Sequence, residues 1–511
     1  MNNKPTPSAL SHSPAAPTSS ASTPAAASSA SSASSASSAS SVGSTRAARP
    51  TRALLAVAAL VALAATGVST VRALEAQPAT PPGYGPNPTL PEPDKRLVPT
   101  INVAKAVGWP VGVQPQPATG LAVTRFADKL DHPRWVYVLP NGDVLVAETN
   151  APVRPDDGKG PKAWITKQFQ KKAGATAKSA NRITLLRDTN GDGIADQRFV
   201  FAEGLNSPFG MALVGPSFYV ANTDAVMRFP YADGQTRLAG PPTKLADLPA
   251  GSINHHWTKS LIASADGTRL YAGIGSNSNV GENGLQNEQH RAGILEIDIK
   301  TGATRVLASG LRNPVGLAWE PTSQALWVSV NERDELGDDL VPDYITSVQD
   351  GGFYGWPYSW YGRHVDDRVK PQRPELVDRA LVPDYAVGAH TASLGLASAD
   401  GNRLTQAFAH GMFVGQHGSW NRQVPAGYKV IFVPFVGAKP SGMPIDVLTG
   451  FLNAKGEAMG RPVGVAVDRA GALLVADDVG NVIWRVTAAG SAGPTAAFPR
   501  AAQAPSAPAS R

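Results

Sequence analysis

Apolar and polar residues form a recurring strand–turn–strand pattern along the body of the chain. Each copy has a small polar lead-in, often a proline, then an apolar run, a turn and a second apolar run, as in LRNPVGLAWEPTSQALWVSVNERD. Alternating apolar positions on both sides of an Asn-Gly or Asp-Gly turn are typical of β-hairpins. Six segments share the pattern, at intervals of about 50–80 residues: 130–150, 205–224, 255–277, 311–334, 391–404 and 459–478.

Further strand candidates lie between these copies, among them RITLLRD, GILEIDI and KVIFVPF. Four short strands per unit, repeated six times, predict an all-β fold, a six-bladed β-propeller, because radial repetition removes the long exposed edge of an open sheet. A pair of β-sandwiches would explain the same turns but not the recurring lead-in. We therefore predict a propeller domain over 119–490.

If the six lead-ins are equivalent, they meet on one face of the propeller around its central axis. Side chains from segments far apart in the sequence then converge on a rigid rim, which is where binding and catalytic residues are often found. The polar residues that we expect there are Asn206, His255, His256, Arg312, Asn313 and Arg461.

The two ends of the chain differ in composition from the body. Residues 1–45 are almost wholly Ser, Ala, Thr and Pro and are predicted to be disordered. In 46–76, arginines precede an apolar stretch and small residues, which predicts a signal peptide cleaved near Ala76 and a periplasmic or secreted protein. An uncleaved membrane anchor is the alternative. A Pro-rich lead-in (77–118) and a disordered tail (491–511) complete the predicted organisation.

The charge and the cysteine count exclude several classes of function. The formal net charge is +6, but cleavage after Ala76 would remove five basic residues and one acid and leave +2. This is no basis for nucleic-acid binding. The chain has no cysteine, which excludes disulfides, thiolate metal sites, iron–sulfur clusters and c-type haem attachment. Redox chemistry would therefore need a cofactor held without sulfur and a separate electron acceptor.

The stretch RDTNGDGIADQRF resembles a calcium loop. Asp188, Asn190, Asp192 and Asp196 occupy positions 1, 3, 5 and 9, and this spacing supplies several hard oxygen ligands from one tight loop. Phe199, however, stands where an EF-hand has its bidentate glutamate. A turn rich in Asx caps is the alternative to a structural calcium site.

Adjacent histidines, His255 and His256, precede the third apolar run. Neighbouring side chains on a strand point to opposite faces, so both are not expected to ligate one metal. Either they are structural, or one faces the rim as a base, because imidazole titrates near neutral pH and suits removal of a hydroxyl proton.

Several motifs together resemble the soluble pyrroloquinoline quinone (PQQ)-dependent sugar dehydrogenases, and most closely the branch of sorbosone and soluble aldose dehydrogenases. They are HHWTKSLIASADG, GLRNPVGLAW, VNERDELGDDLVPDY, GGFYGWPY, and GSWNR followed by YKVIFVPF. The resemblance spans about 120–487. It implies a six-bladed propeller that oxidises a sugar or sugar-derived aldehyde by hydride transfer to PQQ, with calcium, and that passes electrons to a separate quinone, cytochrome or dye.

The resemblance also implies roles for single residues. His256 matches the general base, and Arg312 with Asn313 matches the pair that holds the quinone oxygens. Arg461 matches an arginine that binds a carboxylate of the cofactor, and Asn206 lies at a cofactor-contacting position where better-known members carry Gln. Arginines suit PQQ, which has three carboxylates, through charge-assisted hydrogen bonds.

The same comparison implies a calcium site and a further basic residue. Asn331, Glu332 and Arg333 fall where the family uses backbone carbonyls for a calcium that also binds the cofactor, and this ion would act as a Lewis acid. The lysine expected in the fifth unit is replaced by the neighbourhood of Arg422 and Lys429.

Two other functions are compatible with the sequence. One is a calcium-dependent propeller lactonase or hydrolase, for which Glu148 and Asp477 are the available carboxylates. The other is a non-catalytic propeller that binds carbohydrate.

Overall fold

The computed structural model describes residues 81–94, 100–152 and 178–491. The predicted signal or anchor segment and the predicted disordered ends lie outside these residues. All of the described residues belong to one compact unit, Pro78–Arg511. Within them, no helix is both long enough and apolar enough to span a bilayer.

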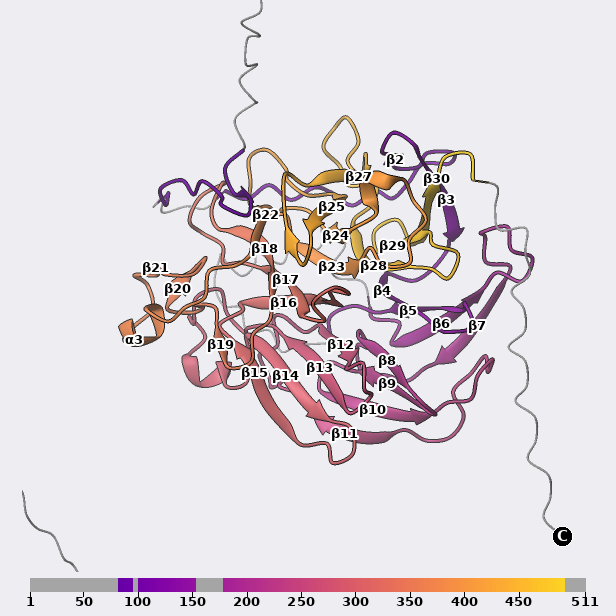
Figure 1. Cartoon of the computed structure of the whole chain (residues 1–511), viewed down its shortest axis with the longest axis horizontal. Coiled ribbons are helices and arrows are strands. Elements are labelled where there is room, and N and C mark those ends of the chain that lie inside the picture. Colours follow the sequence, from indigo (N-terminus) through magenta and orange to yellow (C-terminus); the bar gives the residue numbers. More distant parts are fainter. Residues whose placement is uncertain (1–80, 95–99, 153–177, 492–511) are drawn as a thin grey trace, which may run out of the picture. The chain divides into compact units, whose positions relative to one another are not determined.

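Six antiparallel sheets follow one another around a ring, so the prediction of an all-β, six-bladed propeller is confirmed (Figure 1). The colours in Figure 1 run around this ring from purple through pink to orange and yellow. Blade 1 contains β4 (Pro133–Val138), β5 (Val144–Glu148), β6 (Arg182–Arg187) and β7 (Gln197–Ala202). Blade 2 contains β8 (Met211–Val214), β9 (Ser217–Ala221), β10 (Ala225–Pro230) and β11 (Thr243–Asp247). Blade 3 contains β12 (Lys259–Ala263), β13 (Arg269–Ile274), β14 (Gly293–Asp298) and β15 (Thr304–Ser309).

The other three blades take strands from both ends of the described chain. Blade 4 contains β16 (Asn313–Trp319), β17 (Leu326–Asn331), β18 (Pro342–Ser347), β22 (Tyr385–Ala389) and β1 (Tyr84–Gly85). Blade 5 contains β23 (Ser393–Ser398), β24 (Gly411–Gln416), β25 (Lys429–Val436), β26 (Lys439–Pro440), β27 (Ile445–Thr449) and β2 (Gln116–Pro117). Blade 6 contains β28 (Pro462–Val467), β29 (Leu473–Asp477), β30 (Val482–Ala488) and β3 (Leu121–Ala127).

Short elements decorate the ring. β19 (Gly352–Phe353) pairs in parallel with β15, and β20 (Ser359–Trp360) forms a small hairpin with β21 (His364–Val365). The helical turns are η1 (Leu285–Glu288), α3 (Pro374–Val377) and η2 (Gln406–Phe408).

Blade 6 closes the ring. Its outermost strand, β3, precedes blade 1 in the sequence and pairs antiparallel with β30, the last strand among the described residues. Without β3, the backbone donors and acceptors of β30 would form an open edge, which costs free energy and invites pairing with another chain. The pairing of β3 with β30 therefore holds the two ends of the propeller together.

The innermost strands meet around the axis. One buried apolar cluster contains a residue at or just before the first strand of every blade: Trp135, Phe209, Trp257, Val315, Leu394 and Val463. Polar lead-in residues stand next to these apolar residues in the sequence. The apolar side chains pack in the core, and the starts of the innermost strands lie at one end of the ring.

The glycine that recurs in the lead-in motif allows the blades to pack closely. A Cβ added at Gly316 would lie closer than 3.0 Å to the backbone of Leu396 in the next blade. A Cβ added at Gly464 would lie 2.9 Å from the carbonyl oxygen of Arg134 in blade 1. The repeat in the sequence therefore has a steric cause, because only glycine permits this approach of two inner strands.

Candidate active site

The predicted base His256 precedes the innermost strand of blade 3. Its Nδ1 lies 2.7 Å from the carbonyl oxygen of Ser276, so Nδ1 donates and Nε2 is left as the proton-accepting nitrogen. Burial, followed by the positive charge of Arg312, holds the pKa of His256 well below its usual value. The imidazole is therefore neutral at neutral pH, as a general base must be. The neighbouring His255 is exposed.

His256, Arg312 and Asn313 meet at a two-residue segment that follows β13. The backbone N–H of Ser276 donates to the carbonyl oxygen of Arg312 over 2.8 Å. A Cβ added at Gly275 would lie closer than 3.0 Å to both Asn313 Oδ1 and His256 Cβ. The structure thus brings together three of the predicted site residues, and the absence of a side chain at position 275 is what lets them approach.

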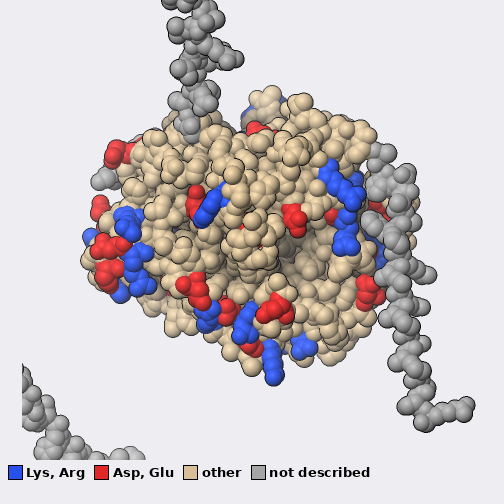
Figure 2. Space-filling view, in the orientation of Figure 1, with Lys and Arg blue, Asp and Glu red and all other residues tan. Residues whose placement is uncertain are grey.

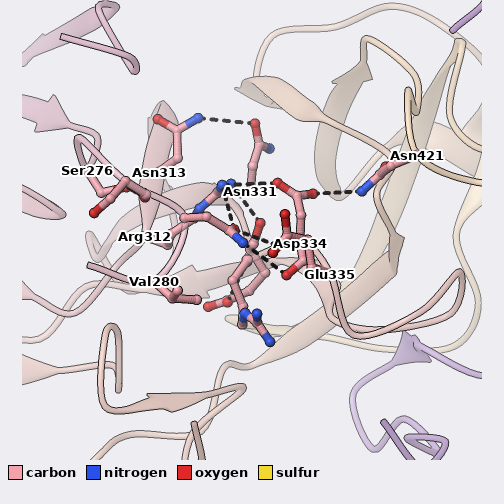
Figure 3. Close-up of polar contacts among 12 residues, drawn as sticks. Ser276, Val280, Arg312, Asn313, Asn331, Asp334, Glu335 and Asn421 are labelled. Carbon is pink, nitrogen blue, oxygen red and sulfur yellow. Dashed lines mark hydrogen bonds and ion pairs between the residues drawn. The ribbon is translucent and has the colours of Figure 1, made fainter. Parts of the chain in front are cut away.

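Arg312 is almost fully buried and is fixed by acceptors on two blades (Figure 3). Its Nη1 donates to the carbonyl oxygen of Glu332 at 2.8 Å, and its Nη2 donates to Asn279 Oδ1 at 3.0 Å. Nη2 also forms an ion pair with Asp334 Oδ2 at 3.1 Å. A guanidinium held in this way is an anion-binding group in a defined orientation.

Asn313 and Asn331 continue this layer toward blade 5. Asn313 Nδ2 donates to Asn331 Oδ1 at 3.3 Å, and Asn331 Nδ2 donates to the carbonyl oxygen of Ser393 at 2.6 Å. Asn313 Oδ1 is buried and has no hydrogen-bond partner among the described residues. A buried acceptor in this state is a place for a ligand or an ordered water to donate a hydrogen bond.

Asp334 is the centre of a network that the sequence did not reveal. Its Oδ1 accepts from Asn421 Nδ2 at 2.9 Å and lies 3.2 Å from His390 Nδ1. Burial alone would raise the pKa of Asp334, but Arg312 and His390 hold it at about 2. Burial opposes the charged form of His390, yet Asp334 raises its pKa above the usual value. Asp334 is therefore an anion held by the guanidinium of Arg312 and the imidazole of His390.

The predicted calcium ligands Glu332 and Arg333 lie in the interior of blade 4. Glu332 is buried, and burial raises the pKa of its carboxyl group to about 8. Arg333 is 1% exposed and lies 3.2 Å from Asp366 in an ion pair. The carbonyl oxygen of Glu332 already accepts from the Arg312 guanidinium, a cation that would repel a calcium ion at the same oxygen. This calcium site stays a prediction.

The other predicted cofactor residues make their hydrogen bonds elsewhere. Arg461 Nη2 donates to the carbonyl oxygen of Ala104 and to the Tyr428 hydroxyl, both at 3.3 Å, and the guanidinium lies over the Tyr428 ring. Arg422 pairs with Asp339 at 2.9 Å. Asn206 Nδ2 donates to Asp224 at 2.9 Å. Arg461 directly precedes an innermost strand, as Arg312 does. Among the described residues, the hydrogen bonds and ion pairs of Arg422 and Asn206 do not include His256.

A second charged cluster spans blades 1, 5 and 6 and was also missed. Asp478 is buried and accepts from Arg134 Nη1 at 2.7 Å and from His417 Nε2 at 2.9 Å. Burial opposes the charged form, but His417, His132 and Arg134 hold the pKa of Asp478 far below its usual range. The signal that could have revealed it is positional, because Asp478 and Asp334 each follow the second strand of a blade.

The acidic loop between β6 and β7 uses its own carboxylates as turn acceptors. Asp188 accepts from the backbone N–H groups of Gly191 and Gly193 at 2.7 and 2.8 Å, and Asp196 accepts from Thr189. A Cβ at Gly193 would lie 2.7 Å from Arg485 Nη1, so a cation already borders the loop. Among the described residues, no group of three or more His, Asp or Glu side chains converges as a metal site. Calcium at Asp188, Asn190, Asp192 and Asp196 stays a prediction.

Comparison with known proteins agrees with this fold and these motifs. The TrAA12-like family model matches residues 175–345 and 377–489, more than half of the chain. The chain belongs to the TrAA12-like family. The resemblance to the soluble PQQ-dependent sugar dehydrogenases is thereby confirmed at the level of the family, since a PQQ-dependent pyranose dehydrogenase is among the relatives of this chain.

Two relatives show how far the similarity extends. An uncharacterized protein of Borreliella burgdorferi is 25% identical over 69% of this chain and 95% of its own length. A PQQ-dependent pyranose dehydrogenase of Coprinopsis cinerea is 26% identical over 38% of this chain. The match spans only 32% of the length of that enzyme.

Two solved structures share the fold. The holo form of the pyranose dehydrogenase PQQ domain from Coprinopsis cinerea has a TM-score of 0.59 and 20% identity, covering 75% of this chain and 100% of that domain. The calcium structure of the family AA12 enzyme from Trichoderma reesei also has a TM-score of 0.59, with 17% identity over 76% of this chain and 99% of that one.

Proposed function

We propose that this protein is an oxidoreductase that oxidises a sugar or a sugar-derived aldehyde with PQQ as its cofactor. The observation that carries the proposal is the neutral imidazole of His256, oriented by Ser276, beside the fixed guanidinium of Arg312. The pyranose dehydrogenase PQQ domain supports it as a relative of the same fold.

The polar groups of this face fit an anionic, hydrogen-bonding cofactor. Nε of Arg312 and Nε of Arg461 are buried and have no hydrogen-bond partner among the described residues, and the same holds for Asn313 Oδ1. Two arginine donors suit the carboxylates and quinone oxygens of PQQ, and the amide of Asn313 can both donate and accept. We assign Arg312, Asn313 and Arg461 to cofactor binding, with Asn206, Asn331 and Arg422 as further contacts.

In the proposed reaction His256 performs the proton transfer. Its Nε2 takes the hydroxyl proton of the substrate, while the Nδ1–H bond to Ser276 keeps the ring in the tautomer that can accept. PQQ, when bound, supplies a two-electron acceptor for the hydride of the substrate carbon. Arg312 stabilises negative charge beside the base, because its guanidinium is already oriented and needs no rearrangement. Electrons then leave to a separate acceptor.

Reconstitution tests this function. Purified apo-protein is titrated with PQQ and Ca²⁺, followed by dye reduction with a panel of aldoses and sugar aldehydes. We expect saturable PQQ binding and dye reduction that His256→Gln lowers by about 100-fold or more, within the usual contribution of a general base. His410→Gln is a matched control, because the His410 side chain contacts the carbonyl oxygen of Gly437 and the ring of Phe435 in blade 5, and neither is a residue of the proposed site. Absence of PQQ binding and of turnover across the panel would refute the proposal.

The two carboxylates that the hydrolase alternative would need as metal ligands are already occupied by hydrogen bonds. Glu148 accepts from Arg182, Thr184 and the backbone of Asp131, so both of its oxygens are used. Asp477 accepts from the indoles of Trp109 and Trp484 and from two backbone N–H groups. The carbohydrate-binding alternative remains distinguishable, because it predicts sugar binding without dye reduction in the wild type.

We further propose that the protein is exported to the periplasm or secreted, with cleavage of the signal peptide after Ala76. Terminal sequencing of the mature protein, together with cell fractionation, tests this location. Retention of the segment in a membrane fraction would instead support the anchor.

A further inference from the structure

Two buried basic side chains lie directly behind His256. Lys259 is 0% exposed and Arg291 is 6% exposed. Lys259 is the first residue of β12, three positions after His256, and Arg291 precedes β14 of the same blade. The hydrogen bonds of both head groups end on carbonyl and amide oxygens, which do not neutralise a positive charge. Burial of a basic head group among such oxygens is costly, so packing alone does not explain these residues.

Both head groups are aimed at the backbone that carries the base. Lys259 Nζ lies 3.3 Å from the carbonyl oxygen of His256 and 3.2 Å from that of Trp257. Arg291 Nη2 lies 3.3 Å from the same carbonyl oxygen of His256. The head groups of two basic side chains thus hold the carbonyl groups of two consecutive residues, while Ser276 holds the imidazole.

Side chains of neighbouring segments complete the support. Asn254 Oδ1 accepts from Arg291 at 3.1 Å and lies 3.4 Å from Lys259 Nζ. Asn254 Nδ2 donates to the Thr223 hydroxyl at 2.7 Å, and that hydroxyl donates to the carbonyl oxygen of Trp257 at 2.8 Å. The network therefore links blade 2 to the start of blade 3 underneath His256.

We propose that Lys259 and Arg291 are positioning residues for His256, which clamp the backbone of residues 256–257 so that Nδ1 meets Ser276 and Nε2 faces the substrate. This inference rests on the proposed function for its catalytic consequence but not for its geometry. The proposal gives a role to Lys259, the lysine of the motif HHWTKSL, which takes no part in the proposed reaction itself.

The charge of Arg291 adds an electrostatic effect. Burial, Arg312 and Arg291 all lower the pKa of His256, whereas the bond to Ser276 and the charge of Asp334 raise it. Burial and the nearby Arg291 also lower the pKa of Lys259 well below its usual value. Loss of the Arg291 charge must therefore raise the pKa of His256 and move the acid limb of the activity profile to higher pH, because the base has to be deprotonated.

The first readout needs neither cofactor nor turnover. Nitrogen–proton correlation NMR of the histidine rings in apo-protein reports the tautomer and pKa of His256, with its signals identified by their loss in His256→Gln. We expect the Nδ1–H tautomer in the wild type, a second or averaged ring state in Lys259→Met, and a higher titration midpoint in Arg291→Met. Lys244→Met is the matched control, because Lys244 is an exposed lysine on β11 that pairs with Asp247. It should leave the His256 signals unchanged.

The second readout is kinetic, in protein loaded with PQQ. We expect Lys259→Met to lower kcat by about 10- to 100-fold with KM changed less than about threefold, since displacement of a catalytic group by about 1 Å has effects of this size. The affinity for PQQ should stay within about threefold. If Lys259→Met does not fold, Thr223→Val tests the same clamp without removing a basic group, and it should disturb the His256 signals in the same direction.

The outcomes separate the two proposals. Wild-type His256 signals in folded Lys259→Met, or in Thr223→Val where only that variant folds, would overturn the positioning role. An unchanged titration midpoint in Arg291→Met would overturn the electrostatic part. If the wild type binds no PQQ while the variants still disturb His256, the proposed function fails and the positioning role stands.

Discussion

Replacement of Gly275 by alanine tests whether close contact of His256 and Asn313 builds the site. The Cβ of Gly275→Ala would lie closer than 3.0 Å to both Asn313 Oδ1 and His256 Cβ, whereas ordinary contacts lie at 3.4–4 Å. The groups must therefore separate by at least 0.4 Å, the difference between 3.4 and 3.0 Å. Both neighbours are tied by hydrogen bonds, to Ser276 and Asn331, so neither can move freely.

The expected cost has a structural and a catalytic part. Overpacking of this kind destabilises a protein by about 1–3 kcal/mol, which denaturant unfolding measures. Displacement of the base from its partners should lower kcat of the PQQ-loaded protein by about tenfold or more. Gly464→Ala is the matched control: it crowds Arg134 O at 2.9 Å between two inner strands, but does not touch His256. We expect it to lower stability with little change in kcat. Equal kcat in Gly275→Ala and the wild type would refute the reasoning.

Three further predictions follow from the polar groups of the site and of the acidic loop. Asp334→Asn removes the negative charge that holds the Arg312 guanidinium, so the affinity for PQQ should fall by about 10-fold. A fluorescence titration measures this affinity, and an unchanged value would contradict the role of Asp334. Burial raises the pKa of Glu332 in the folded protein to about 8, above its unfolded value, so the native state binds one more proton than the unfolded state. The free energy of unfolding should therefore decrease as the pH rises from about 5 to about 8, by at most about 1.4 kcal/mol per pH unit. Glu332→Gln should reduce that slope in chelator-treated protein, and an unchanged slope would assign it to another group. If the acidic loop binds calcium, Ca²⁺ should raise the melting temperature of the apo-protein and Asp188→Ala should remove the increase; an equal increase in both proteins would place the ion elsewhere.

Much of the fold could be predicted because it depends on local patterns. The alternation of apolar residues, the Asn-Gly and Asp-Gly turns and the recurring lead-in each act within a few residues of sequence, so they are visible without the structure. The pairing of β3 with β30 was not visible, because the two strands are separated by the whole propeller and carry no local mark of their partner.

The candidate site divides in the same way. His256, Arg312 and Asn313 could be singled out from their positions in repeated motifs, and the structure brings these three together around Gly275. The partners of Arg312 could not be identified, since Asp334 reaches it only through the fold and is itself held by His390, which follows β22, and by Asn421 of blade 5.

The charge distribution also needed the structure. On the face shown in Figure 2, which is hollowed near its centre, acidic and basic side chains are interspersed and mostly peripheral. A net charge computed from the composition says nothing of this arrangement, nor of the buried Lys259 and Arg291 behind the base.

Patterns of side chains along the chain thus specified the blades, the turns and the lead-in positions, because hydrophobic periodicity and turn chemistry are short-range properties. The protonation states, the orientation of His256 and the hydrogen bonds of Arg312 were decided by the tertiary structure, because they depend on desolvation and on partners contributed by other blades. A pKa or a hydrogen bond is set by what lies within a few ångströms in space, and distance along the chain does not encode that.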